Sequence, residues 1–312
     1  MLCGSFPIGP GSILKRLQVM LLGCSMLAAL AVDPALAAMT EHQQQVAAWR
    51  AGRVERLTAE DGWLSLIGLH WLPVGATQTL GNGEGNDIDL AVGPARLGTL
   101  SWADGKARFE VDAGAQVQVD GKPVTVVDLS SGDKAHPIVV RFGSANFQMI
   151  DRGGKHALRV KDNQAATRTG FTGIRYFDID PNWRIDARFE AYDEPRSIEV
   201  ATVVGTLESY PNPGRIVFER DGKTHSIEAL VEEDQEQYFL IIADRSSGKE
   251  TYGMARYLYA GPAVDGHIVV DFNRAYNPPC AFTAFATCPM PPEGNRLDLY
   301  VAAGEKTYAS GH

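Results

Sequence analysis

The sequence has no apolar run long enough to cross a membrane as a helix. The best candidate, residues 17–32, is interrupted by Gln18, Cys24 and Ser25, whereas a transmembrane helix needs about 20 mainly apolar residues. Clusters of lysine and arginine are also missing, and the formal net charge is −9. We therefore expect no transmembrane span, no nucleic-acid partner and no binding to anionic membrane surfaces.

Cysteine is scarce. Two of the four cysteines, Cys3 and Cys24, lie near the N-terminus, which leaves Cys280 and Cys288 in the body of the chain. A pair of this kind predicts a disulfide if the compartment is oxidising. The alternatives are a reactive thiol, which needs a nearby histidine, and a soft-metal site completed by a methionine or histidine.

The common catalytic signatures are absent as well. The sequence contains no G-x-S-x-G, H-E-x-x-H, Walker or dinucleotide-binding motif, and its seven histidines are scattered without metal-ligand spacing. The acidic run that begins at Glu232 lacks the spacing of a calcium loop and indicates a solvated hairpin. We therefore assign no catalytic residue, predict no cofactor and no metal site, and leave open whether the protein is an enzyme.

What the first 37 residues do contain is a leader pattern. Lys15 and Arg16 precede the apolar stretch, and Ala35-Leu36-Ala37 supplies small residues at a cleavage site. The pattern predicts a signal peptide removed near Ala37 and a periplasmic or secreted protein. The alternative is a lipid anchor at Cys24, because Leu21-Leu22-Gly23-Cys24 resembles a bacterial lipobox.

The next segment predicts one amphipathic helix at residues 41–60. Thr40 and Gln43 match a capping box, and Val46, Trp49, Arg53 and Leu57 follow at three- to four-residue spacing. Beyond it, short alternating runs separated by Asp-Gly and Gly-Gly pairs predict antiparallel strands joined by tight turns. The fold class is therefore all-β with an N-terminal helix.

The polar stretch at residues 161–169 suggests a domain boundary. We predict a β-sandwich over residues 63–161 and a second antiparallel β-domain over residues 170–312. Residues 277–292 are rich in proline, which disfavours both a helix and a central strand. We expect this segment to form an ordered loop or surface strap.

The first β-region resembles a forkhead-associated domain. Gly85-Asn86-Asp87-Ile88-Asp89-Leu90 precedes a Val119-Asp120-Gly121 turn and the LSSGD sequence at residues 129–133. The resemblance implies a β-sandwich. Phosphopeptide binding is not expected, because Asn82 follows Gly81 where that family has an arginine, and residues 94–97 offer no Ser-x-x-His loop.

The C-terminal region carries most of a resemblance to the bacterial family catalogued as domain of unknown function 1684. The resemblance rests on DFNRAYNPPCAF at residues 271–282, Thr287-Cys288-Pro289, Asn295-Arg296-Leu297 and Ala303-Gly304-Glu305. Upstream, Thr251-Tyr252-Gly253, Arg256-Tyr257-Leu258 and Gly62-Trp63-Leu64-Ser65-Leu66 fit it too, so the resemblance covers nearly the whole chain after the predicted leader. It implies neither an activity nor a substrate.

The same region offers the candidate ligand residues Arg256, Asn273, Arg274, Tyr276 and Asn277. Arginine can hold a carboxylate or phosphate with two parallel hydrogen bonds, and loops at strand ends often carry binding sites. The alternative is that these side chains satisfy the backbone of the proline-rich strap. We expect a periplasmic module that binds a small polar or anionic ligand; a hydrolase-like enzyme using the same loop and a structural envelope protein are the alternatives.

Overall fold

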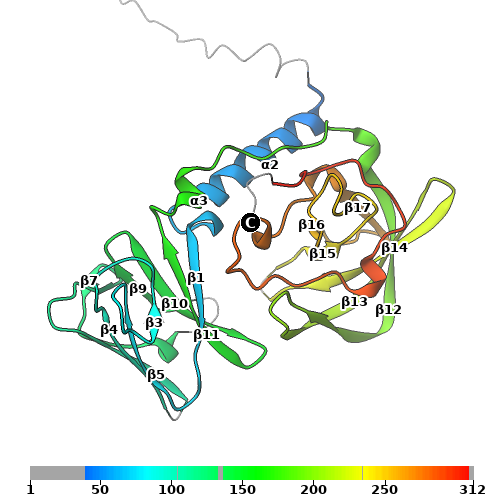
Figure 1. Ribbon diagram of the computed structural model, residues 1–312. Helices are drawn as coiled ribbons and strands as arrows, with labels where there is room; N and C mark the ends of the chain where they lie inside the picture. The colour runs from blue at the N-terminus through cyan, green and yellow to red at the C-terminus, as the bar shows by residue number, and fades with distance from the viewer. Residues whose placement is uncertain (1–38, 104, 133–135, 234, 309–312) are drawn as a thin grey trace, which may run out of the picture. The chain divides into compact units, whose positions relative to one another are not determined.

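The structure is a computed structural model that describes residues 39–103, 105–132, 136–233 and 235–308 (Figure 1). From Thr40 onward the chain forms one compact unit. The predicted leader and the lipobox-like sequence lie outside the described residues. The division of the remaining chain into two domains stays a prediction.

The all-β class and the N-terminal helix are confirmed. Helix α2 (Glu41–Thr58) begins with the predicted capping box: the Gln43 amide donates to Thr40 Oγ1 over 3.2 Å, and the Thr40 amide donates to Gln43 Oε1 over 2.9 Å. These bonds satisfy amide groups that have no partner inside the helix. A second helix, α3 (Ala166–Thr169), is a single turn within the predicted boundary segment.

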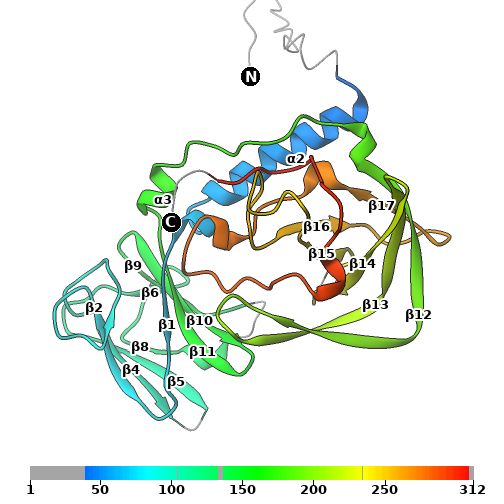
Figure 2. The same cartoon turned by 45° about the vertical axis from the view of Figure 1, so that its right-hand side comes forward.

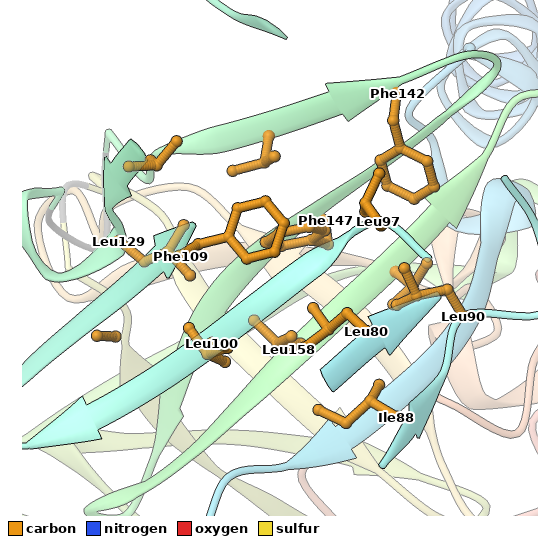
Figure 3. Packing of buried hydrophobic residues seen from close by; sticks show 14 of the residues in the cluster. Leu80, Ile88, Leu90, Leu97, Leu100, Phe109, Leu129, Phe142, Phe147 and Leu158 are labelled. Carbon is orange, nitrogen blue, oxygen red and sulfur yellow. The ribbon is translucent and has the colours of Figure 1, made fainter. Parts of the chain in front are cut away.

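Two sheets enclose the first core (Figure 3). Their facing side chains alternate with outward polar ones, as the period of two along a strand requires, and Phe109 and Phe147 meet edge to face at 5.2 Å. Only the β2–β3 pairing is parallel among the described strand pairs of these sheets. The broad class therefore agrees with the expected sandwich, while the particular likeness to a forkhead-associated domain stays a prediction.

The six-stranded sheet consists, in spatial order, of β1 (Leu66–Trp71), β11 (Lys155–Asp162), β10 (Ala145–Arg152), β9 (Val139–Phe142), β6 (Gln118–Val119) and β7 (Lys122–Pro123). The five-stranded sheet consists of β3 (Ile88–Asp89), β2 (Thr77–Gly81), β4 (Gly98–Ala103), β5 (Lys106–Val111) and β8 (Val126–Asp128).

The third sheet contains the long strands of the C-terminal region (Figure 2). One face covers a core that includes Ile216, Leu240 and Val270. The opposite face carries a second set of buried side chains, among them Phe239 and Tyr257. The first face is part of a hydrophobic core, whereas the face with Phe239 and Tyr257 borders the candidate site. In spatial order the strands are β16 (Arg256–Ala260), β15 (Tyr238–Ile242), β14 (Lys223–Val231), β13 (Leu207–Arg220), β12 (Arg184–Ala201) and β17 (His267–Asp271).

The tight turns follow the sequence prediction. Asp221 and Gly222 have φ angles of 52° and 72°, and Asp265 and Gly266 have 51° and 78°. Two consecutive positive φ angles are what a two-residue turn between twisted antiparallel strands requires, and aspartate and glycine tolerate them best. The turns fix the register of β13 against β14 and the approach to β17.

Helix α2 lies beside the C-terminal region (Figures 1 and 2), and polar side-chain contacts fasten it there. Arg53 Nε donates to Glu305 Oε1 over 3.1 Å, and Arg53 Nη2 donates to the Asn277 carbonyl over 2.8 Å. Arg50 adds a bond to the Phe177 carbonyl at 3.0 Å. The helix therefore contacts residues that lie far from it in the sequence.

Candidate functional site

Arg256, a predicted ligand residue, lies wholly inside the protein. Its Nη2 atom is 2.5 Å from Asp244 Oδ2, and the same nitrogen donates to the Val301 carbonyl over 3.1 Å. Its Nη1 atom donates to the Ala303 carbonyl. Both charged side chains are 0% exposed, so these contacts place Arg256 in a structural role.

The two predicted asparagines are also buried and hold backbone. Asn273 Nδ2 donates to the Asp180 carbonyl over 2.9 Å, and Asn277 Nδ2 donates to the Lys306 carbonyl over 2.8 Å. Arg274 lies beside Asp271, with 3.5 Å between Nε and Oδ2. These contacts correspond to the backbone-satisfying alternative stated above, and none of Asn273, Asn277 and Arg274 lines the large cleft described next.

Tyr276 is the predicted residue that does reach this cleft, which has a volume of about 2230 Å³. The cleft lies within the compact unit and receives side chains from α2, from the six-stranded sheet, from the third sheet and from the proline-rich strap. Its volume exceeds the roughly 300–1,000 Å³ of an ordinary small-molecule pocket. It is the natural place to look for a ligand.

The wall formed by the six-stranded sheet is cationic. Gln148 on β10 pairs with Arg159 on β11, and Lys161 follows Arg159 by two residues, so all three side chains project from the same face. The opposite face of these strands packs Phe147 and Val160 into the sandwich core. The alternation that buries one face therefore presents basic and amide groups on the other.

Arg159 is the exceptional member of this wall. It is 7% exposed, and its Nε and Nη2 atoms are buried without a hydrogen-bond partner among the described residues. The guanidinium lies 4.9 Å from the centre of the Trp63 ring. Burial, reinforced by repulsion from Arg152, lowers the pKa of Arg159 to about 10. A buried cation bordering a cleft lacks the acceptors that such groups normally have.

The facing wall is aromatic. Phe239 on β15 pairs with Tyr259 on β16, and their rings stack with centroids 5.2 Å apart. Tyr276 stacks on Tyr259 at 6.4 Å and receives the Arg53 guanidinium at 4.6 Å. Burial raises the pKa of Tyr276 to about 12. The phenols stay neutral at physiological pH and present rings and hydroxyl groups to the cleft.

Carboxylates accompany these tyrosines. Tyr259 donates to Glu232 Oε2 over 2.5 Å, and Tyr210 donates to Glu208 Oε2 over 2.8 Å. Glu208 also pairs with Arg152 over 3.3 Å. Glu232, expected in a solvated hairpin, is thus a half-buried lining residue of the cleft.

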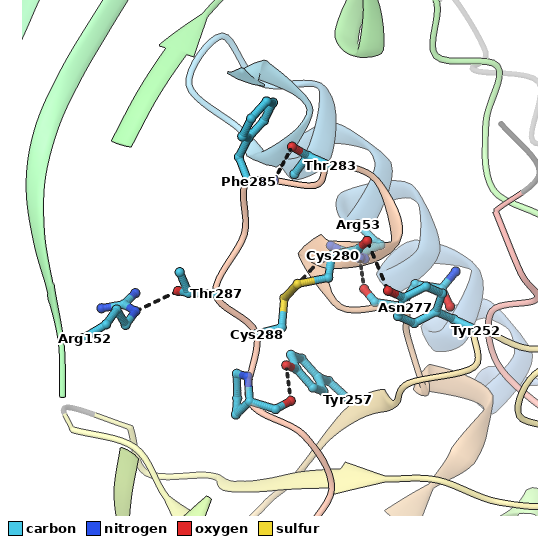
Figure 4. Close-up of a disulfide and its surroundings, with 11 residues drawn as sticks. Arg53, Arg152, Tyr252, Tyr257, Asn277, Cys280, Thr283, Phe285, Thr287 and Cys288 are labelled. Carbon is cyan, nitrogen blue, oxygen red and sulfur yellow. Dashed lines mark hydrogen bonds between the residues drawn. A yellow bond between two sulfur atoms is a disulfide. The ribbon is translucent and has the colours of Figure 1, made fainter. Parts of the chain in front are cut away.

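The proline-rich strap carries the Cys280–Cys288 disulfide (Figure 4). The structure therefore selects the disulfide among the three interpretations of this pair. Thr287, next to Cys288, accepts a hydrogen bond of 2.8 Å from Arg152 Nε, and the Pro289 carbonyl accepts one of 2.8 Å from Tyr257. The disulfide thus shapes a strap whose residues line the cleft. Within the described part of the chain, no group of three histidine, cysteine or acidic residues could hold a metal ion.

Sequence reasoning missed Arg159, Trp63 and the tyrosines of the third sheet. The alternation in KHALRVKD at residues 155–162 shows two faces, and it signals that Arg159 and Lys161 share one of them. It does not show that another part of the protein covers that face.

Residues 169–306 match the family described as "Protein of unknown function (DUF1684)". The C-terminal part of the chain therefore belongs to that family.

The chain is also similar to an uncharacterised protein from gene locus rrnAC0354 of Haloarcula marismortui, known from a solution NMR structure. The identity is 31%, over 46% of this chain and 81% of that one, with a TM-score of 0.39. No curated protein matches. Among the described residues, none of the helices has both the length and the apolar character needed to cross a membrane.

Proposed function

We propose that this protein is a binding module that holds a small anionic ligand, a carboxylate or a phosphate, beside Arg159. The carrying observation is the buried guanidinium of Arg159, whose Nε and Nη2 atoms have no partner among the described residues. These two nitrogens form one edge of the planar guanidinium, and such an edge can bind two oxygens of a single carboxylate or phosphate. An anion entering the cleft can supply these missing acceptors.

The surroundings of Arg159 support this assignment. Lys161 reinforces the positive charge of the same sheet face, and the Trp63 ring lies beside both cations, 4.9 Å from Arg159 and 6.0 Å from Lys161. A site in which water is largely excluded strengthens the attraction between opposite charges. The proposed ligand site is therefore the cleft. The loop at residues 271–305, where the sequence predicted the site, forms one side of it.

Localisation is part of the proposal. We infer that the protein works in a periplasmic or extracellular compartment. The leader pattern in the sequence and the Cys280–Cys288 disulfide support this inference, because disulfides persist in oxidising compartments.

Calorimetric titration with acetate, benzoate and inorganic phosphate tests the ligand class. We expect at least one of these probes to bind, and Arg159→Met to weaken its affinity at least tenfold. Arg108→Met is the matched control, because it removes one positive charge from an exposed position on β5. The proposal fails if none of the three anions binds, or if Arg159→Met binds them as well as the unaltered protein does.

A further inference from the structure

The cleft is charged oppositely on its two sides. Arg159 and Lys161 belong to the six-stranded sheet, whereas Glu208 and Glu232 lie on or directly after strands of the third sheet. A ligand that satisfies Arg159 alone uses one side of a space larger than an ordinary small-molecule pocket.

Glu232 differs from Glu208 in how its charge is balanced. Glu208 has an arginine partner, Arg152, at 3.3 Å. Glu232 accepts a hydrogen bond from Tyr259, and no ion pair joins it to a basic side chain among the described residues. Among the residues that the structure describes, the cleft therefore has a cation with two unpartnered donors on one side and a carboxylate without an ion pair on the other.

The rings around Glu232 suit a positively charged group as well. Tyr259, its hydrogen-bond partner, belongs to the stacked set that includes Phe239 and Tyr276. Tyr276 already accommodates the Arg53 guanidinium at 4.6 Å, so a cation fits against a ring of this wall. Aromatic rings beside a carboxylate are a recurrent environment for ammonium groups.

We infer that the ligand is a zwitterion, with its carboxylate or phosphate at Arg159 and a primary ammonium group at Glu232 and Tyr259. The inference rests on the proposed function, since it takes the anionic end from there. A primary ammonium group has three donors and no acceptor, so it complements a carboxylate whose partner among the described residues is the Tyr259 hydroxyl.

A series of straight-chain ω-amino acids measures the ammonium contribution directly. We expect one of glycine, 4-aminobutyrate, 6-aminohexanoate and 8-aminooctanoate to bind at least tenfold more tightly than the plain carboxylate of the same chain length. N-acetylation of that amino acid should abolish the gain without any change to the protein. Glu232→Gln should also abolish it.

Glu236→Gln is the matched control, because it removes the same charge from an exposed position in the same loop. It should retain the gain. If plain or acetylated carboxylates bind as tightly as the amino acids, the zwitterion inference is overturned and the anion-binding function stands. If neither carboxylates nor amino acids bind, the zwitterion inference is overturned, and the proposed function fails with it if inorganic phosphate does not bind either.

Discussion

Replacing Arg159 with methionine should make the protein more stable while removing ligand binding. Methionine keeps a long unbranched chain in the same place but has no donors to satisfy. The pKa of Arg159, lowered from 12.5 to about 10 by burial, corresponds to about 3 kcal/mol against the charged form. A second estimate comes from the two unpaired donors of Arg159, Nε and Nη2. Each buried donor without a partner costs about 1–3 kcal/mol, so the total cost is of similar size.

The substitution also loses the attraction between the guanidinium and the Trp63 ring, which is worth about 1–2 kcal/mol in a partly desolvated place. The net expectation is a gain of about 1–3 kcal/mol in the free energy of unfolding. Urea denaturation with linear extrapolation measures it. The exposed control Arg108→Met should change stability by no more than about 0.5 kcal/mol.

The sign of the pH dependence provides an internal check. Because the pKa of Arg159 is lowered in the folded state, the unfolded chain holds more protons only above about pH 10. The cost of the buried charge is therefore fully present at neutral pH and is relieved only above about pH 10. The gain from Arg159→Met should be the same at pH 6 and pH 8. A loss of 1 kcal/mol or more at either pH would refute the reasoning, since Arg159 would then have acceptors in the folded protein.

Arg53→Met should lower the free energy of unfolding by about 3–5 kcal/mol, because it leaves the Glu305 carboxylate buried without its cation. Adding Glu305→Gln should restore part of this loss, measured by the same urea denaturation. Changing both Cys280 and Cys288 to serine should cost about 2–3 kcal/mol and leave anion binding measured below the melting transition intact, whereas free thiols in the native protein, seen by non-reducing mass spectrometry, would contradict the disulfide. Intact mass of the protein purified from its native host should show an N-terminus at or near Ala38, and a lipid-modified Cys24 would defeat the signal-peptide prediction.

Local structure was predictable where neighbouring residues decide it. The capping box of Thr40 and Gln43 specifies where α2 begins, because both partners lie within one turn. The Asp-Gly pairs at residues 221 and 265 specify tight turns, because they tolerate the required backbone angles. These features depend on a few consecutive residues.

The candidate site was not predictable in the same way. Arg256 stands in the strand RYLYA, where nothing nearby shows that Asp244 and two distant carbonyls surround it. Arg159 occupies an outward position on its strand, which for an isolated sandwich indicates exposure to solvent. Its burial beside Trp63 depends on packing between segments almost a hundred residues apart. Alternation along a strand identifies the face of a side chain but cannot identify what covers that face.

The attachment of α2 has a consequence for the order in which the chain acquires its structure. The helix is made early, but Glu305, which binds Arg53, follows 252 positions later. During synthesis the helix therefore lacks this ion-pair partner until nearly the whole chain has emerged. Its apolar residue Leu57 packs with Ala281 and Phe282 as well as with Leu64, so part of its cover also arrives late. Truncation before Glu305 should leave Arg53 without its carboxylate partner, so shortened chains should be less stable and more readily degraded although every strand of the three sheets is present.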